Sequence, residues 1–277
     1  MNELSKAVEQ LERPTTAEFQ PYASAPRPLL IRGAAERWPA LTEWTPDSLA
    51  AKSRNAEVPL MKLGTGNPDG RFFYGEETVG MSKFSECLEL LSGAPARVYM
   101  AGVPIAIYLP ALADDVGRLE FVDDKKQRRS QLWISGTGSR GPLHYDLDNN
   151  IHVLISGRKR FLMFEYSQSR NLYPCSILSA NPHHSRVDAV HPDTNRFSRF
   201  GQQQGYDVTL NPGEMIYIPT GCWHQVITEA PSVAVNFWLG KSLFRRSTMC
   251  IYLSLVLTVM SSSLRAIRRR SAPTMLT

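Results

Sequence analysis

Two histidines and an aspartate have the residue types and the spacing of a metal site. His144 and Asp146 are separated by one residue and follow a Gly-Pro pair, so in a strand both side chains point to the same face. His224 ends a second segment, residues 210–224, in which a Pro-Gly turn precedes a short apolar run. Two imidazoles and one carboxylate, with the other coordination positions left open, form the ligand set of non-haem Fe(II) oxygenases. The spacing therefore predicts that His144, Asp146 and His224 bind Fe(II).

A lysine further along the same segment could bind an organic acid beside this metal. Lys159 follows the Ser156-Gly157 pair, within the sequence Arg-Lys-Arg. A 2-oxo acid binds iron through its keto oxygen and the adjacent carboxylate, so its far carboxylate needs a cation at a fixed distance, and lysine provides such a point charge. Tyr99 could add a hydroxyl donor to the same oxygens. The alternative for Lys159 is one more exposed base, and spacing alone does not decide between the two.

Three further histidines, His183, His184 and His191, lie in a stretch rich in Pro, Asp and Asn, over residues 172–200. We expect this stretch to be an irregular insertion between strands, with these histidines at the surface. Such insertions are natural places for substrate contacts. Ordinary half-buried histidines are the alternative to a metal site, but they account less well for three ligands placed where strands end.

The elements that must position these residues change in character near residue 130. In the first part we expect helices over residues 2–12, 34–38 and 82–92 (with Ser82 as N-cap) and from Thr45, and strands over 28–33, 57–63, 71–74 and 97–101. After it we expect seven short β segments separated by Gly, Pro and Asn, over residues 131–134, 151–155, 160–164, 206–210, 215–218, 225–228 and 233–238. Many short strands with turn residues between them are typical of a sandwich, barrel or jelly roll. The sequence therefore predicts a mainly β fold with flanking helices.

This change also suggests three parts of the chain. Residues 1–130 would form an N-terminal α/β part that packs on the core and supplies Tyr99, residues 131–240 the β core, and residues 241–277 a tail. The net charge of +5 arises in the tail, which holds seven bases and no acid, whereas the other 240 residues hold 24 bases and 26 acids. A slightly acidic body has no general attraction for nucleic acid.

The tail contains an uncharged stretch, residues 248–264, bracketed by arginines. Its length is at the lower limit of the roughly 17–25 residues of a membrane span. Three interpretations stay open: a C-terminal helix packing on the body or on a second copy in a homodimer, a membrane-surface or tail anchor, and a non-native or alternatively spliced end.

Four scattered cysteines and a start without an apolar core predict a cytoplasmic or nuclear location, without disulfides or a secretory signal.

Several short motifs surround the candidate residues. They are His144-Tyr-Asp, Asn150, Gly157-Arg-Lys159-Arg-Phe, Leu172-Tyr-Pro, Pro212-Gly-Glu, Ile218-Pro, Trp223-His224 and Val235-Asn236-Phe-Trp. Together they resemble the JmjC/cupin-8 oxygenases, and most closely the factor-inhibiting-HIF type of protein hydroxylase and its small JmjC-only relatives. The resemblance covers roughly residues 14–240 and is strongest over residues 131–240.

This resemblance implies a double-stranded β-helix (jelly roll) that binds Fe(II) and uses 2-oxoglutarate as its cosubstrate. The implied site consists of the metal ligands His144, Asp146 and His224, of Lys159 and Tyr99 at the far carboxylate, and of Asn150 and Asn236 near the cosubstrate. The implied reaction decarboxylates 2-oxoglutarate to succinate and CO2 and hydroxylates a C–H bond.

The sequence departs from the family pattern at two positions. Gly141 stands three residues before His144, where these enzymes commonly have Thr or Ser, so the site lacks a hydroxyl donor that a water or Tyr99 would have to replace. His152 occupies a position that is often aromatic, and we expect it to be a wall of the pocket. Further aromatic residues that could be pocket walls, or equally part of the core, are Trp223, Phe237 and Trp238.

The expected function is hydroxylation of a protein side chain. Small JmjC-only members of the family mostly hydroxylate protein side chains and a few act on a tRNA base, and the near-neutral body favours a peptide over RNA. Nothing resembles the added reader domains of chromatin demethylases, which favours hydroxylation over histone demethylation. The alternatives are a tRNA-base or small-molecule hydroxylase, a catalytically silent cupin that binds a partner, and a metal-dependent cupin enzyme that needs no 2-oxo acid.

Overall fold

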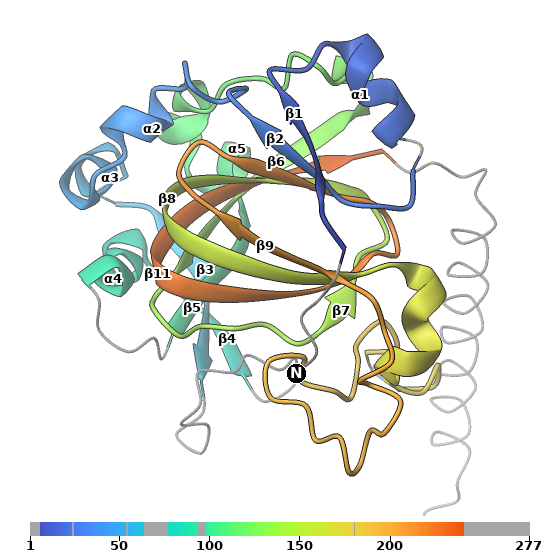
Figure 1. Ribbon diagram of the computed structural model, residues 1–277. Helices are drawn as coiled ribbons and strands as arrows, with labels where there is room; N and C mark the ends of the chain where they lie inside the picture. The colour runs from blue at the N-terminus through green and yellow to red at the C-terminus, as the bar shows by residue number, and fades with distance from the viewer. Residues whose placement is uncertain are drawn as a thin grey trace, which may run out of the picture.

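The computed structural model describes residues 6–23, 25–53, 55–63, 77–92, 98–179 and 181–240 (Figure 1). The predicted strand over residues 71–74 and the predicted tail helix, homodimer and membrane contact lie outside these residues. Within the described ranges, none of the helices has the length and apolar character needed to span a membrane.

Eleven strands of the described chain form one continuous sheet. The strands are β1 (Glu9–Glu12), β2 (Leu29–Arg32), β3 (Glu57–Leu63), β4 (Glu77–Lys83), β5 (Val98–Pro104), β6 (Gln127–Ser135), β7 (His144–Tyr145), β8 (Asn149–Phe164), β9 (Tyr206–Leu210), β10 (Met215–Ile218) and β11 (Trp223–Leu239). They follow the order β1-β2-β10-β8-β11-β6-β5-β3-β4, with β7 paired to β11 and β9 to β8. The strand β6 spans the predicted boundary at residue 130, and the division into parts stays a prediction.

Short helices surround this sheet. They are α1 (Thr16–Ala23), α2 (Ala40–Glu43), α3 (Pro46–Lys52), α4 (Phe84–Leu88) and α5 (Ile105–Tyr108), with 3-10 turns over Glu89–Ser92, Pro110–Asp115, Asp124–Lys126 and Tyr166–Leu172. Figure 1 shows the α-helices around the outside of the β-structure. The predicted mainly β fold with flanking helices is confirmed.

The strands β8 and β11 form the long curved ribbon at the centre of the fold (Figure 1). They pair antiparallel along their whole length, but β8 pairs with β10 before its bend and with β9 after it. The bend occurs at Gly157, which has a φ of +87°. A larger residue would not fit at this position, because its Cβ would lie 2.0 Å from the carbonyl oxygen of Pro231. The four segments predicted over residues 151–155, 160–164, 225–228 and 233–238 are therefore two bent strands.

The N-terminal segment differs from the prediction. Residues 9–12 form the edge strand β1, which runs parallel to β2, and not part of a helix. The apolar residues Leu4, Val8 and Leu11 have the spacing of one face of a helix, but over residues 9–12 backbone pairing with β2 decides the conformation. In the same way Ser82, predicted as an N-cap, is part of β4, and residues 34–38 form a turn that precedes α2.

The main hydrophobic core lies between the sheet and the helices. Phe19 of α1, Leu49 of α3 and Phe84 of α4 are buried in one cluster with Ile151 of β8 and Val235 of β11. Burial of such side chains contributes about 1.5–3 kcal/mol each, which fixes the helices to the back of the central ribbon.

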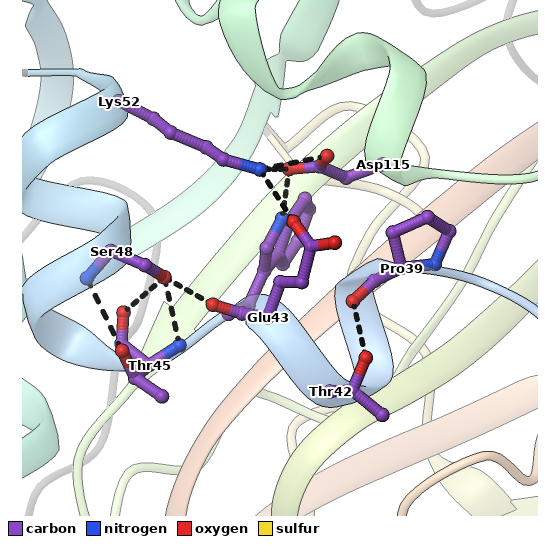
Figure 2. Close-up of polar contacts among 8 residues, drawn as sticks. Pro39, Thr42, Glu43, Thr45, Ser48, Lys52 and Asp115 are labelled. Atoms are coloured by element: carbon purple, nitrogen blue, oxygen red, sulfur yellow. Dashed lines mark hydrogen bonds and ion pairs between the residues drawn. The ribbon is translucent and has the colours of Figure 1, made fainter.

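A polar corner holds α2 and α3 to the body (Figure 2). The Ser48 amide donates to Thr45 Oγ1 at 3.2 Å and the Thr45 amide donates to Ser48 Oγ at 3.1 Å, which caps the start of α3. Next to this cap the buried Asp115 carboxylate accepts hydrogen bonds from Trp44 Nε1 at 2.8 Å and from Lys52 Nζ at 2.7 Å. Asp115 therefore connects both helices to the following part of the chain.

We expect Asp115→Ala to lower the free energy of unfolding by about 1–3 kcal/mol, because the buried indole N–H of Trp44 loses its acceptor. Urea denaturation followed by tryptophan fluorescence measures this change. Glu43→Ala serves as the control, since it removes only the exposed partner of Lys52 and exposed ion pairs contribute little. Equal losses of stability in the two variants would contradict the role of Asp115.

Candidate functional site

The two predicted histidine ligands are direct cross-strand neighbours. The strand β7 pairs antiparallel with the start of β11, and this register places His144 opposite His224. Their ring centroids are 4.3 Å apart. Residues far apart in the sequence therefore meet because a two-residue strand pairs with the last strand of the fold.

Asp146 completes the group just after β7. Its carboxylate oxygens lie 3.9 Å from His144 Nε2 and 3.6 Å from His224 Nε2. The ligand atoms of the three residues all lie within 4.8 Å of one another. The Gly221 amide donates to the Asp146 carbonyl at 2.9 Å, which fixes the backbone at the position where the carboxylate must point inward.

Both imidazoles are oriented by hydrogen bonds on their other nitrogen. His144 Nδ1 lies 2.9 Å from the Pro142 carbonyl and His224 Nδ1 lies 3.0 Å from the Cys222 carbonyl. Because a carbonyl can only accept, each Nδ1 carries a proton and donates it, which leaves each Nε2 on the side of Asp146 as the atom that can bind a metal ion. This is the arrangement that a metal ion requires from neutral histidine ligands.

Burial and the neighbouring His224 lower the pKa of His144 to about 4. The His144 ring is therefore neutral at physiological pH, and no proton has to leave it when a cation binds.

A cavity of about 410 Å³ opens in front of this group. It lies between the ends of the central ribbon and the strands β3, β5 and β6. All the residues predicted for the site line it, namely His144, Asp146, His224, Lys159, Tyr99, Asn150 and Asn236. Their roles as ligands stay predictions, but the fold brings all seven to one cavity.

Lys159 is unusual among these residues because its amine is buried, which lowers the stability of the fold. Its side chain is 1% exposed, and it makes no hydrogen bond or ion pair with the described residues. Burial lowers its pKa to about 7. A buried amine without a counter-charge destabilises the fold unless a bound anion compensates for it. The interpretation of Lys159 as one more exposed base is therefore wrong.

The sheet register explains why Tyr99 faces the same cavity as Lys159. Tyr99 of β5 is paired with Ser135 of β6, and Thr228 of β11 is paired with Lys159 of β8. Ser135 Oγ and Thr228 Oγ1 are 3.0 Å apart and connect these two pairs. Paired residues point to the same face of a sheet. In this register the buried hydroxyl groups of Ser135 and Thr228 therefore lie between the two predicted carboxylate anchors.

Polar atoms without partners surround the cavity between Lys159 and the histidines. Asn150 and Asn236 are buried, and the Oδ1 atom of each lacks a hydrogen-bond partner. The Nε2 atom of the buried His152 also lacks one. Buried polar groups in folded proteins are nearly always hydrogen-bonded, so these atoms indicate a polar ligand or water molecules in the cavity.

The insertion after β8 is closer to the site than predicted. The Tyr145 amide donates to the His183 carbonyl at 3.1 Å, and this pairing places His183 at the cavity and His184 in the interior, 5.7 Å from the His144 ring. The expected surface position is wrong for His184, because the insertion pairs with β7 and buries this residue, whereas His183 is half-buried. His191 is exposed, as expected.

Gln225 connects this insertion to the core. It follows His224 on β11, accepts a hydrogen bond from the Ala189 amide at 2.8 Å and donates one to the Gly141 carbonyl at 2.9 Å.

The cavity has open space at Gly141, where the family commonly has a hydroxyl group. A Cβ built on Gly141 would meet no atom within 4 Å.

The aromatic residues proposed as walls divide between core and cavity. Trp223 and Phe237 are buried in hydrophobic clusters, and only Trp238 of the three lines the cavity. Several other lining residues were not predicted for the site, because strand register and loop course decide which side chains face inward. These residues are Pro59, Met61, Ala101, Gly102, Gln131, Trp133, Pro142, Phe161, Ile218 and Val226.

The donor set fits an Fe(II) ion with 2-oxoglutarate. Two imidazoles and a carboxylate on one side leave the cavity side open for further ligands. The buried cation and the unpartnered amide oxygens lie in the same cavity and fit a small dicarboxylate with polar groups along its length.

Comparisons with known proteins agree with this fit. Residues 15–242 match the sequence profile of the family described as cupin-like domain. Lysine-specific demethylase JMJ31 of Arabidopsis thaliana is 27% identical over 81% of this chain and 48% of its own length, and Jumonji C domain-containing protein 5 of Drosophila melanogaster is 27% identical over 83% and 59%. The human bifunctional peptidase and (3S)-lysyl hydroxylase JMJD7 is 25% identical over 84% of both chains. The chain spans about half the length of the first two relatives.

We expect Lys159→Met to raise the melting temperature of the protein in the absence of 2-oxoglutarate, because an apolar side chain replaces an uncompensated buried amine. Between pH 7 and pH 10.5 the unfolded chain binds a proton that folded Lys159 has lost, so the stability of the wild type should rise with pH over this range. The advantage of Lys159→Met should shrink accordingly. Thermal unfolding by circular dichroism across this range measures both effects.

The exposed Lys125 provides the control for this experiment, since Lys125→Met should leave the pH dependence unchanged. A Lys159→Met protein that is less stable than the wild type throughout the range would show that the amine has a stabilising partner.

Proposed function

This chain belongs to the family of cupin-like domains of the JmjC type, and on that premise we propose that it is an Fe(II)- and 2-oxoglutarate-dependent oxygenase that hydroxylates a protein side chain. Fe(II) and 2-oxoglutarate are the cofactor and cosubstrate of JmjC members of this family, which include named demethylases and a lysyl hydroxylase. The proposal concerns the activity and the substrate of this chain.

One observation supports the proposal above all others. The His144, Asp146 and His224 group lies in the same cavity as the buried, unpartnered Lys159. A metal-binding cupin without a 2-oxo acid would gain nothing from a buried cation at this place. A catalytically silent binding module would not need open positions beside a metal group.

Each residue then has a stated task. His144, Asp146 and His224 hold Fe(II), which when bound activates O2 for attack on a C–H bond. The ammonium group of Lys159 and the hydroxyl group of Tyr99 hold the far carboxylate of 2-oxoglutarate. The apolar side chains of the cavity wall, such as that of Met61, exclude water from the reacting atoms.

A protein substrate is supported by the names of the relatives. Several are called lysine-specific demethylases and JMJD7 is called a lysyl hydroxylase, and all of these names refer to protein side chains. Hydroxylation and demethylation share the same first step, attack on a C–H bond. We propose hydroxylation as the activity of this chain. Demethylation of lysine is the second candidate, because several relatives are named demethylases.

Binding of the cosubstrate is the first expected result. Anaerobic titration of the Fe(II)-loaded protein with 2-oxoglutarate should produce the visible metal-to-ligand charge-transfer band. His144→Ala should abolish the band because it removes a metal ligand. Lys159→Met should weaken 2-oxoglutarate binding by about two orders of magnitude, since hydrogen bonds to charged groups contribute roughly 1.5–3 kcal/mol.

Bound iron without any band in the wild type would contradict the oxygenase proposal. The two remaining candidates would then be the catalytically silent cupin that binds a partner and the cupin enzyme that needs no 2-oxo acid. Partner binding that is unaffected by His144→Ala would favour the silent cupin.

The substrate class is tested separately. Incubation with a library of lysine-containing peptides and of their methylated forms should give products with one added oxygen atom, detected by mass spectrometry together with succinate. Loss of a methyl group from methylated peptides would identify demethylation instead. Succinate formation stimulated by a tRNA and by none of the peptides would contradict a protein substrate.

A further inference from the structure

One buried polar side chain of the cavity has no task in the function proposed so far. His152 is 4% exposed, and its Nε2 atom has no hydrogen-bond partner. A buried polar atom without a partner costs roughly 1–3 kcal/mol. An aromatic side chain would fill the same wall without this cost, so the imidazole needs a ligand to offset it.

The strand β8 directs this ring into the cavity. Side chains alternate along a strand, so Asn150 and His152 share the face that lines the cavity. After the bend in β8, Phe161 lies on the same side, and its ring meets the His152 ring edge-on with centroids 5.1 Å apart. This contact and the position of Asn236 opposite His152 on β11 hold the imidazole in one place.

His152 lines the same cavity as Lys159, and its ring contacts Phe161, the next residue after Lys159 on that face of β8. Burial, and next the charge of Lys159, lower the pKa of His152, whereas a side-chain hydrogen bond with Asn236 acts in the opposite direction. A neutral imidazole still carries one N–H donor, which is what a carboxylate oxygen needs.

We propose that His152 is a third anchor for the far carboxylate of 2-oxoglutarate, in addition to Lys159 and Tyr99, and that it donates a hydrogen bond from Nε2. This role rests on the proposed function, because it needs 2-oxoglutarate in the cavity. His152 would thereby replace the hydroxyl donor that is missing at Gly141, where the cavity is open. The departure at Gly141 and the departure at His152 then compensate for each other.

The test measures binding and not turnover. The Fe(II)-loaded full chain is titrated anaerobically with 2-oxoglutarate and with pyruvate, which has the chelating end but no far carboxylate. His152→Phe should weaken 2-oxoglutarate binding about tenfold, the effect of 1.4 kcal/mol, and leave the affinities for pyruvate and for Fe(II) unchanged. His152→Gln, whose amide nitrogen reaches the same place, should retain most of the affinity. The exposed His191→Phe is the matched control, and melting temperatures verify that every variant folds.

The outcomes separate this role from the proposed function. If the wild type and His152→Phe form the band with the same affinity for 2-oxoglutarate, the role of His152 is overturned and the proposed function is not. Equal losses for 2-oxoglutarate and pyruvate, or equal losses in the Phe and Gln variants, also overturn it, because the ring would then act on the metal end or through packing. No band in the wild type overturns both this role and the proposed function.

Discussion

An amine without a counter-charge in the interior is the constraint on which the rest of this structure depends. Lys159 lies on the inner face of the central ribbon, where its side chain is buried and where the described residues provide no partner. The surrounding fold must supply enough stability to tolerate this cost, and the helices packed on the back of the ribbon do so through the main core. A bound dianion removes the cost, so the ligand-bound form is also the more stable form.

Paired strands position most of the site. The two histidines are placed by a cross-strand pair, the two predicted carboxylate anchors by the register of four neighbouring strands, and the insertion is held to β11 by the hydrogen bond from the Ala189 amide to Gln225. Sites on strands hold their geometry more closely than sites on flexible loops. The loop residues that reach the cavity, such as His183, do so because their backbone is paired with β7.

The sequence was most informative where chemistry limits the choice of residue. Metal-ligand types at strand ends and the quoted motifs predicted the seven site residues and the β class. Non-local pairing decided the rest: residues 9–12, predicted as part of a helix, form the edge strand β1, and His184 is buried because the insertion pairs with β7. The choice between core and cavity for Trp223 and Trp238 depends on strand register, which no local pattern reveals.

The pairing of β7 with β11 sets the order of events during synthesis. The strand β8 leaves the ribosome before its partners β9, β10 and β11, so its long edges stay unpaired until the last strand arrives. Contacts between such distant segments form slowly, and unpaired edges attract other chains in the meantime. Because His224 lies at the start of β11, the nascent chain acquires its complete metal group only when the sheet can close. The three candidate ligand side chains therefore come together late, and only in a closed sheet.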